Sequence, residues 1–372
     1  MITQTLFKTV GGGEGFRRFQ LGKRGQPIKV MQVDDMVDLQ PFEGATNRTA
    51  VILCQKGQKT EYPIEYHLWR KKEKGSISID LSLSEVQART IVRYLKAQSI
   101  SDSLTGPWVT AKPKAIRALR NVMGTSDYIA REGCSGGLNS VYLLHVIEKE
   151  NNTLRIQNYT ENAKVKVKHV EALLEPDFVF PTLRGREVRR WKAIPEIAIV
   201  IPHNPDNPSN GMPIQTLEKK YPKTFNYFNS FHSDLVARSI LKHFLQNQPF
   251  YALYNTGQYT FSPYKVVWTR VTDDLRCAVV GDHSVASLSN VTVTPIETVV
   301  FVPFEDLNES HYFCALLNST PSRFTIASYS NKGTGSFGSP HILEHVAIKK
   351  YDSNSVLHIE PVSYTHLPSP RD

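Results

Sequence analysis

The stretch Ile197-Ala198-Ile199-Val200-Ile201 is, together with Thr298–Phe304, the longest apolar run in the chain. Runs of this length suit a buried β-strand and fall far short of the ~18 apolar residues that a membrane-spanning helix needs. Other short runs separated by turn residues lie at Val141–Ile147, Leu154–Asn158, Val165–Val170, Lys265–Val271 and Val299–Val302. With helices expected near Pro222–Phe244 and Glu309–Asn318, the sequence predicts a mixed, β-rich α+β domain from residue 126 onward and no membrane partner.

Before residue 126 the chain predicts a strand-rich segment followed by a helical one. Ile28–Val33 alternates apolar and polar residues, and Arg48–Gln55 carries a second apolar run, so both are predicted strands. Ser82 and Glu85 match the capping-box pattern, and apolar residues follow at helical spacing as far as Leu95. This spacing predicts a helix.

The composition indicates a folded protein with a modest positive charge. The 372 residues include 44 Lys and Arg against 35 Asp and Glu, a formal charge of +9. Apolar residues make up 40% and charged residues 21%, which excludes a largely disordered chain. The N-terminus lacks a secretion signal, and four cysteines have no paired spacing: Cys54, Cys134, Cys277 and Cys314. We therefore expect reduced thiols in a cytoplasmic protein, without a zinc site or a disulfide framework.

Three patterns imitate known sites. Gly11–Gly15 resembles a cofactor loop, but only ten residues precede it, too few for a full strand and turn, which favours a surface loop. His341 and His345 have the spacing of an inverted zincin, but the helix would be very short, which favours a loop-to-strand junction. Asp206 and Glu218 imitate the carboxylates of a metal-dependent nuclease, although a loop and a helix carry them rather than adjoining strands.

Basic residues interleaved with aromatic ones are the stronger pattern. Arg184–Lys192 holds five cations and Trp191 within nine residues. Cations bind phosphates, and arginine also reaches guanine edges. A solvated charged loop explains any one such cluster equally well, but three clusters in one β-rich domain indicate nucleic acid. The residues that we expect to contact DNA are Tyr128, Arg131, Arg184, Arg186, Arg189, Arg190, Tyr264 and Lys265.

Six segments, in this order and spacing, carry a resemblance to a known family: Phe42–Val51, Tyr128–Gly133, Leu183–Trp191, Tyr259–Trp268, Ala315–Ser319 and His341–Leu343. From residue 1 to about 360 the chain resembles the C-terminal part of an adenine-specific DNA methyltransferase of the type IIG restriction-modification kind. The resemblance implies a Rossmann-like domain that transfers a methyl group from S-adenosylmethionine to the exocyclic amine of adenine. It also implies a following target-recognition domain that reads double-stranded DNA.

The resemblance assigns a role to each part of the chain. Residues 1–75 would be the last strands of the methyltransferase domain, an α/β remnant of its Rossmann-like sheet. Residues 76–125 would be a helical connector, and residues 126–355 the target-recognition domain. Phe42 falls where the family places an aromatic that stacks on the flipped adenine, with a core position as the alternative. Residues 361–372 resemble translated sequencing-adapter DNA, and we expect them to be an artefact.

One departure from the family decides what this chain can do by itself. The family's catalytic tetrapeptide, Asn or Asp followed by Pro-Pro and an aromatic, is absent, because the sequence contains no Pro-Pro dipeptide. We therefore expect a fragment that lacks an N-terminal methyltransferase half, with no catalytic, cofactor-binding or metal-binding residues and no methyl transfer of its own. S-adenosylmethionine would bind only to the intact parent. The alternative is a stand-alone DNA-specificity module that acts with separate modification subunits.

Overall fold

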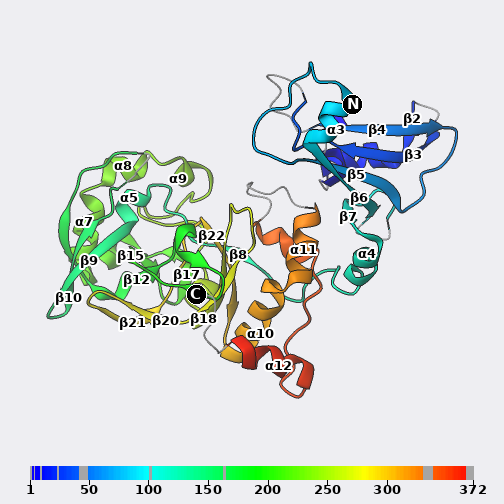
Figure 1. Cartoon of the computed structure of the whole chain (residues 1–372). Helices are drawn as coiled ribbons and strands as arrows, with labels where there is room; N and C mark the ends of the chain where they lie inside the picture. Colours follow the sequence, from blue (N-terminus) through cyan, green and yellow to red (C-terminus); the bar gives the residue numbers. More distant parts are fainter. Residues whose placement is uncertain are drawn as a thin grey trace. The chain divides into compact units, whose positions relative to one another are not determined.

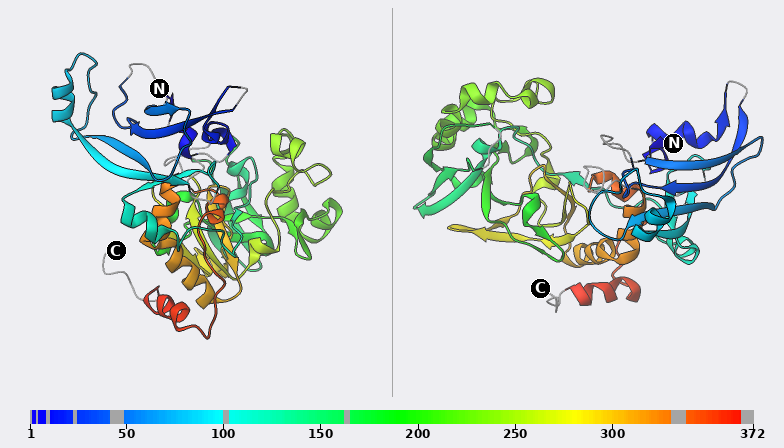
Figure 2. Two further views of the ribbon diagram at one scale, coloured as in Figure 1. Left: turned by 90° about the vertical axis from the view of Figure 1, so that its right-hand side faces the viewer. Right: turned by 45° about the horizontal axis from the view of Figure 1, so that its top comes forward.

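The computed structural model describes residues 2–3, 5–8, 11–22, 25–41, 49–99, 103–161, 165–329 and 338–365. They fold into two compact units. Unit 1 comprises residues 1–125, 320–332 and 344–347, and unit 2 comprises residues 126–319, 333–343 and 348–372. Figures 1 and 2 show that each unit combines helices with β-sheet, so the predicted mixture of α and β structure is confirmed.

Unit 1 is built on one seven-stranded sheet. Its strands are β1 (Ile2–Thr3), β2 (Gln20–Leu21), β3 (Gln26–Asp35), β4 (Thr49–Lys56), β5 (Ile64–Lys71), β6 (Thr90–Ser99) and β7 (Trp108–Ala111). Their order is β1-β4-β3-β5-β6-β7, with β2 beside β3, and β3–β5 is the one parallel pair among them. The core of this unit includes Phe7, Val33 and Trp108, and the rings of Phe7 and Trp108 stack with centroids 4.6 Å apart.

The helices of unit 1 are short. They are α1 (Thr5–Lys8), α2 (Gly11–Glu14), η1 (Phe16–Arg18), α3 (Leu83–Arg89), α4 (Pro113–Leu119) and α11 (Thr320–Tyr329). The capping box is confirmed at α3, where the Ser82 hydroxyl accepts from the Glu85 amide and the Ser82 amide donates to Glu85 Oε2. The helix ends at Arg89, however, because Thr90 and the β-branched residues after it pair with β5.

Residues 76–125 are therefore not a helical connector, and that prediction was wrong. This segment contributes β6 and β7 to the sheet of unit 1. Apolar residues spaced along it fit a helix and a strand equally, and pairing with β5 decides in favour of the strand.

Unit 2 contains a five-stranded and a four-stranded antiparallel sheet. The first has the order β11-β10-β9-β15-β12 and the second β19-β18-β22-β8. Their strands are β8 (Arg131–Glu132), β9 (Leu143–Glu150), β10 (Thr153–Asn158), β11 (Glu171–Leu174), β12 (Val179–Thr182), β15 (Ile197–Val200), β18 (Tyr264–Thr269), β19 (Cys277–Val280) and β22 (Val299–Phe304). The two longest apolar runs form β15 and β22, which are interior strands and almost fully buried.

Three two-stranded pairs and a set of helices complete unit 2. The pairs are β13 (Val188–Arg189) with β14 (Lys192–Ala193), β16 (His203–Asn204) with β17 (Asn207–Gly211), and β20 (Asp282–Val285) with β21 (Leu288–Thr292). The helices are α5 (Asn139–Tyr142), η2 (Pro176–Phe178), η3 (Gly185–Glu187), α6 (Ile214–Lys220), α7 (Pro222–Asn229), α8 (His232–Val236), α9 (Ser239–His243), η4 (Gln258–Phe261), α10 (Leu307–Asn318) and α12 (Val356–Thr365), and η5 (Pro340–Glu344) spans the boundary between the units.

The strand predicted at Val165–Val170 is absent, since these residues form an extended loop without strand pairing. The side chain of Asn158 explains this difference. Its amide donates to the carbonyls of Lys168 and Ser140, and its carbonyl oxygen accepts from the amide of Val170. A side chain thus takes up backbone groups that a neighbouring strand would otherwise pair.

The side chain of Arg238 links several backbone segments of unit 2 by hydrogen bonds. The side chain is buried, and its guanidinium donates to the carbonyls of Gly136, Leu235, Phe250 and Ala252. One side chain therefore satisfies four backbone acceptors, one of which, Gly136, is distant in the sequence.

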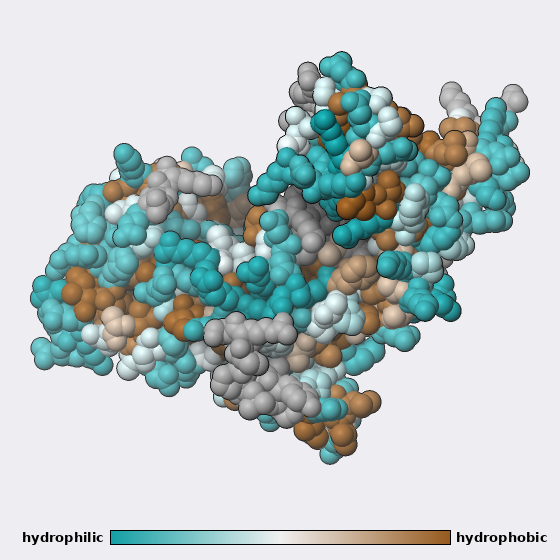
Figure 3. All heavy atoms as spheres, in the orientation of Figure 1, coloured by the Kyte–Doolittle hydropathy of each residue, from teal (hydrophilic) through white to brown (hydrophobic). Residues whose placement is uncertain are grey.

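The face of the molecule drawn in Figure 3 is mostly polar, with a few apolar patches. Figure 3 shows one such patch over α12, where Val356 and Leu357 are exposed. α12 also runs across residue 361, where the expected adapter-derived tail begins, and the origin of that tail stays a prediction. Among the residues that the structure describes, none of the helices has the length and apolar character needed to span a bilayer.

Candidate nucleic-acid interface

The second part of the predicted basic cluster Arg184–Lys192 forms a β-hairpin, residues 188–193, which we call the basic hairpin. Val188 pairs with Ala193 and Arg189 with Lys192, so that Arg190 and Trp191 form the turn. Val188 is buried in a small apolar core of unit 2, which anchors the hairpin. The sequence alternates here because one face of each short strand packs inward and the other faces solvent.

The turn holds Trp191 in an unusual conformation. Its φ angle is +68°, in the left-handed region that bulky residues rarely adopt, and its amide donates to the Cys277 carbonyl at 2.9 Å. The side chain is nevertheless 39% exposed. The exposed ring of Trp191 is therefore carried by a backbone that hydrogen-bonds to β19. Because strained backbone conformations cluster at functional sites, we interpret this turn as part of a binding site.

The cations of the basic hairpin differ in how they are paired. Arg190 lies 3.4 Å from Asp274, which it shares with Arg276. Arg189 and Lys192 are exposed, and neither has an ion-pair partner in the part of the chain that the structure describes. These two charges remain available to an anionic partner.

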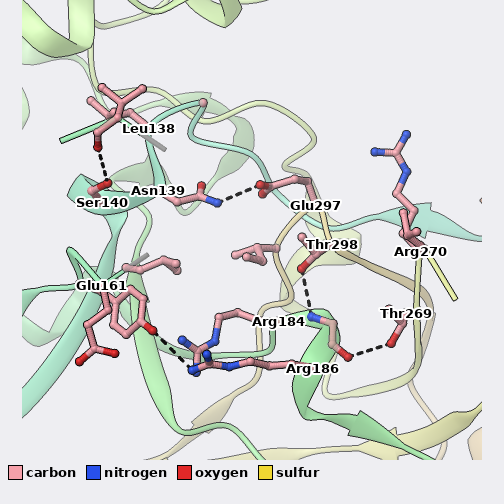
Figure 4. A pocket seen from close by; sticks show the side chains of 17 residues that line it. Leu138, Asn139, Ser140, Glu161, Arg184, Arg186, Thr269, Arg270, Glu297 and Thr298 are labelled. Atoms are coloured by element: carbon pink, nitrogen blue, oxygen red, sulfur yellow. Dashed lines mark hydrogen bonds between the residues drawn. The ribbon is translucent and has the colours of Figure 1, made fainter. Parts of the chain in front are cut away.

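A cavity of about 720 Å³ lies elsewhere in unit 2. Its walls come from residues 137–140, 143, 184–186, 269–271 and 296–298, together with Tyr159, Glu161 and Val165. Figure 4 shows Glu161, Arg184 and Glu297 around it. Residues 183–185 run beside residues 296–298, because the Ile296 amide donates to the Leu183 carbonyl and the Gly185 amide to Thr298 Oγ1. Arg184 and Glu297 are therefore neighbours on adjacent segments.

Arg184 lies in the cavity wall rather than on the surface. Its Nε donates to Glu187 Oε1 at 2.7 Å, its Nη2 reaches Glu196 Oε2 at 3.2 Å, and its guanidinium carbon is 5.0 Å from the Tyr159 ring centroid. The remaining nitrogen, Nη1, is buried and has no hydrogen-bond partner among the residues that the structure describes. Leaving such a donor unpaired costs about 1–3 kcal/mol.

Glu297 presents the complementary group. Asn139 Nδ2 donates to its Oε1 at 2.9 Å, while its Oε2 is buried without a hydrogen-bond partner in the described part of the chain. Sequence reasoning missed both Glu297 and Asn139. A polar residue directly before the apolar run Thr298–Phe304 is the one signal that could have indicated Glu297.

The other predicted DNA-contacting residues divide into exposed and buried ones. Arg186 is 56% exposed at the cavity rim, where it lies 3.8 Å from both Glu187 and Glu196. Arg131 is exposed, with its guanidinium carbon 5.1 Å from the Tyr259 ring centroid. Tyr264 is partly buried on β18.

Two predicted contacts are buried by internal interactions. The Tyr128 hydroxyl donates to Glu309 Oε1 at 3.0 Å and accepts from the Tyr351 amide at 2.9 Å. Lys265 Nζ donates to the Ser262 carbonyl at 2.7 Å, and the residue is 1% exposed. Together with Arg184, these residues are buried in unit 2 rather than exposed on its surface. Phe42 lies outside the described residues.

The burial of Lys265 predicts a dependence of stability on pH. Desolvation lowers the pKa of Lys265 to about 7, whereas a lysine in an unfolded chain titrates near pH 10. Between these values the unfolded chain binds more protons, so the free energy of unfolding should rise with pH, by at most about 1.4 kcal/mol per unit. Urea denaturation at several pH values from about 7 to 9.5 measures the slope. Lys265→Met should make the free energy of unfolding less dependent on pH. An equal slope in the variant and the wild type would contradict the assignment of this dependence to Lys265.

The glycine-rich segment, Gly11–Gly15, does not form a loop that could bind S-adenosylmethionine. Gly11–Glu14 form the helical turn α2 rather than a loop. A Cβ atom at Gly13 would collide with the Leu6 carbonyl and the Arg17 side chain, so the segment is already filled. The residues present in this segment do not fit the cofactor.

Two of the sequence patterns imitate metal sites: Asp206 with Glu218, and His341 with His345. In the described part of the chain, no group of three or more His, Cys, Asp or Glu side chains could hold a metal ion. Asp206 lies in the turn between β16 and β17, and Glu218 lies on α6. His341 is in the 3-10 turn η5, which lacks the α-helical spacing that an inverted zincin uses. All four cysteines are free thiols.

No protein-family model matches the chain. The type II methyltransferase M.NspV from Nostoc sp. is 26% identical over 152 residues, which are 40% of this chain and 29% of that protein. The solved structure of the type IIL restriction-modification enzyme MmeI in complex with DNA aligns with 85% of this chain and 34% of its own, at 9% identity and a TM-score of 0.42. The structure of the type IIG restriction endonuclease BpuSI aligns with 98% of this chain and 41% of its own, at 12% identity and a TM-score of 0.34.

The chain thus spans between 29% and 41% of the length of these three proteins. The resemblance to a DNA methyltransferase, which the order of the six sequence segments predicts, is confirmed by the similarity to the type II methyltransferase M.NspV.

Proposed function

We propose that this chain recognises a sequence in double-stranded DNA as part of a restriction-modification DNA methyltransferase. The observation that carries the proposal is the basic hairpin, which presents Arg189 and Lys192 without ion-pair partners in the described structure and the exposed ring of Trp191 between them. Cations on a fixed hairpin suit DNA phosphates, and an accessible indole suits stacking on a base. The similarity to a type II methyltransferase supports the same function.

In this proposal, methyl transfer belongs to the whole protein, of the type IIG kind. It uses S-adenosylmethionine to methylate the exocyclic amine of adenine, and a further part of the protein supplies the cofactor site and the catalytic tetrapeptide. Residues 1–75 contribute the end of the Rossmann-like sheet, and residues 126–355 are the target-recognition domain. This polypeptide alone binds DNA without methylating it, in the cytoplasm, where its four cysteines stay reduced.

The proposal is tested by measuring the affinity of the chain for duplex DNA at salt concentrations from about 50 to 300 mM. The logarithm of the binding constant should fall steeply with the logarithm of the salt concentration, by about 0.9 per phosphate contacted. Arg186→Ala and Arg189→Ala should each reduce this slope by about one. Lys265→Met, which removes a buried cation, is the matched control and should leave the slope unchanged. An affinity independent of salt, or slopes unaltered in both arginine variants, would refute the proposal.

A further inference from the structure

The helix α4 of unit 1 carries a second concentration of positive charge, in a different unit from the basic hairpin. Residues 103–126 contain no Asp or Glu, and their four cations are all exposed: Lys112, Lys114, Arg117 and Arg120. None of the four has an ion-pair partner or a side-chain hydrogen bond in the part of the chain that the structure describes. We call these four residues the α4 patch.

The sequence of α4 fixes the side on which these charges lie. Ile116 and Leu119 are buried, so one side of the helix packs into unit 1, where α4 contacts β6 and β7 (Figure 1). Lys114, Arg117 and Arg120 recur every three residues on the exposed side. Side chains at this spacing are neighbours on a helix surface, so the three charges form a stripe along α4.

The stability of α4 does not explain this stripe. Like charges three residues apart repel each other and destabilise a helix, and α4 has no acidic residue to offset the repulsion. A solvated charged surface more often mixes both signs, as on α6, where Glu218 directly precedes Lys219 and Lys220. The α4 patch is therefore arranged for an anionic partner, which would relieve the repulsion.

The length and chemistry of the stripe suit the phosphates of duplex DNA. From Lys114 to Arg120 the helix axis rises by about 9 Å. Over about that length, duplex DNA carries roughly five negative charges, enough to meet every cation of the stripe. The other residues of α4 are a proline, two alanines and two buried apolar residues, so the helix presents neither an acceptor side chain nor an aromatic ring to a base.

We infer that the α4 patch binds the phosphate backbone of duplex DNA and gives unit 1 a DNA contact of its own. The inference rests on the proposed function, because it takes the recognised DNA as the partner. Phosphate contacts add affinity but carry no sequence information. The α4 patch therefore strengthens binding to all sequences alike, and the sequence preference of the chain does not depend on it.

The test uses the variant Lys114→Ala, Arg117→Ala, Arg120→Ala, with binding to duplex DNA followed by fluorescence anisotropy over a range of salt concentrations. The log–log salt slope should fall by about two to three, and the affinity in about 100 mM salt by about sixty- to five-hundredfold. Exchanging each of the three residues between lysine and arginine keeps the charges and should keep the slope. Alanine favours a helix and all three positions are exposed, so the variant should fold, which thermal unfolding checks.

A second variant separates a local contact from an effect of net charge. Lys219→Ala, Lys220→Ala, Lys223→Ala removes the same number of exposed cations from α6 and α7 of unit 2, and it should change the slope by less than about one. If this variant and the α4 variant lose equal affinity, the loss reflects net charge, and the inference is overturned.

Sequencing the duplexes that each protein binds from a random pool tests whether the contact is to phosphates. The α4 variant should select the same sequences as the wild type, which also shows that its recognition surface is intact. A changed preference would mean that the patch contacts bases, against the inference.

The outcomes distinguish this inference from the function on which it rests. If the wild type does not bind duplex DNA, the proposed function falls and the inference falls with it. If the wild type binds DNA with a steep salt dependence and the α4 variant keeps the same slope, the inference alone is overturned. Polyglutamate that binds the wild type but not the α4 variant, with the DNA slope unchanged, would instead assign the patch to an acidic protein.

Discussion

Replacing Arg189 and Lys192 with alanine and Trp191 with glycine in one variant should lower the affinity for duplex DNA about a thousandfold in about 100 mM salt. Each lost phosphate contact accounts for roughly an eightfold loss at this salt concentration, because the binding constant varies with about the 0.9 power of salt per contact. Loss of a stacked aromatic adds about 1–3 kcal/mol, that is, about fivefold to more than a hundredfold. The basic hairpin provides both kinds of contact.

A double and a single variant distinguish the two contributions. Arg189→Ala with Lys192→Ala should reduce the log–log salt slope by about two, whereas Trp191→Gly should lower affinity without changing the slope. Glycine is the suitable replacement because it adopts a φ of +68° without strain, so the hairpin keeps its conformation. Fluorescence anisotropy measures the affinities. If the combined variant binds as tightly as the wild type, the hairpin is not the DNA contact.

Replacing Arg238 with methionine should lower the free energy of unfolding by about 3–5 kcal/mol. The substitution keeps most of the aliphatic stem but leaves the four carbonyls of Gly136, Leu235, Phe250 and Ala252 without their shared donor. Arg238→Lys should recover little of the loss, because an ammonium cannot reproduce the planar fork of a guanidinium.

Urea denaturation of the two Arg238 variants beside the wild type measures this effect. Arg189→Met, which makes the same change on the exposed face of the basic hairpin, is the control and should stay within about 0.5 kcal/mol of the wild type. A loss below about 1 kcal/mol for Arg238→Met would show that solvent or other groups replace the guanidinium.

Parts of the fold with strong local signals could be predicted from the sequence. Uninterrupted apolar runs gave β15 and β22, because a strand buried on both faces needs apolar residues at every position. The capping box at Ser82 correctly placed the start of α3. The end of that helix was predicted wrongly because its competitor, pairing of β6 with β5, depends on residues far away in the sequence.

The candidate site shows the same limit. The charge of Arg184–Lys192 is visible in the sequence, but the sequence does not distinguish Arg184, which Glu187 and Glu196 hold in the cavity wall, from the exposed Arg189. Glu297 was missed because its neighbours Asn139 and Arg184 come from distant segments. Such roles arise only when tertiary contacts form.

The interleaving of the two units has a consequence for recombination between related genes. The chain changes from one unit to the other after residues 125, 319, 332, 343 and 347. A single crossover at residue 125 would therefore join β7 from one parent to an α11 from the other, although these two elements pack together in unit 1. Chimaeras that exchange a continuous block ending near residue 319 keep both elements from one parent. We expect such chimaeras to be more viable than those with one crossover.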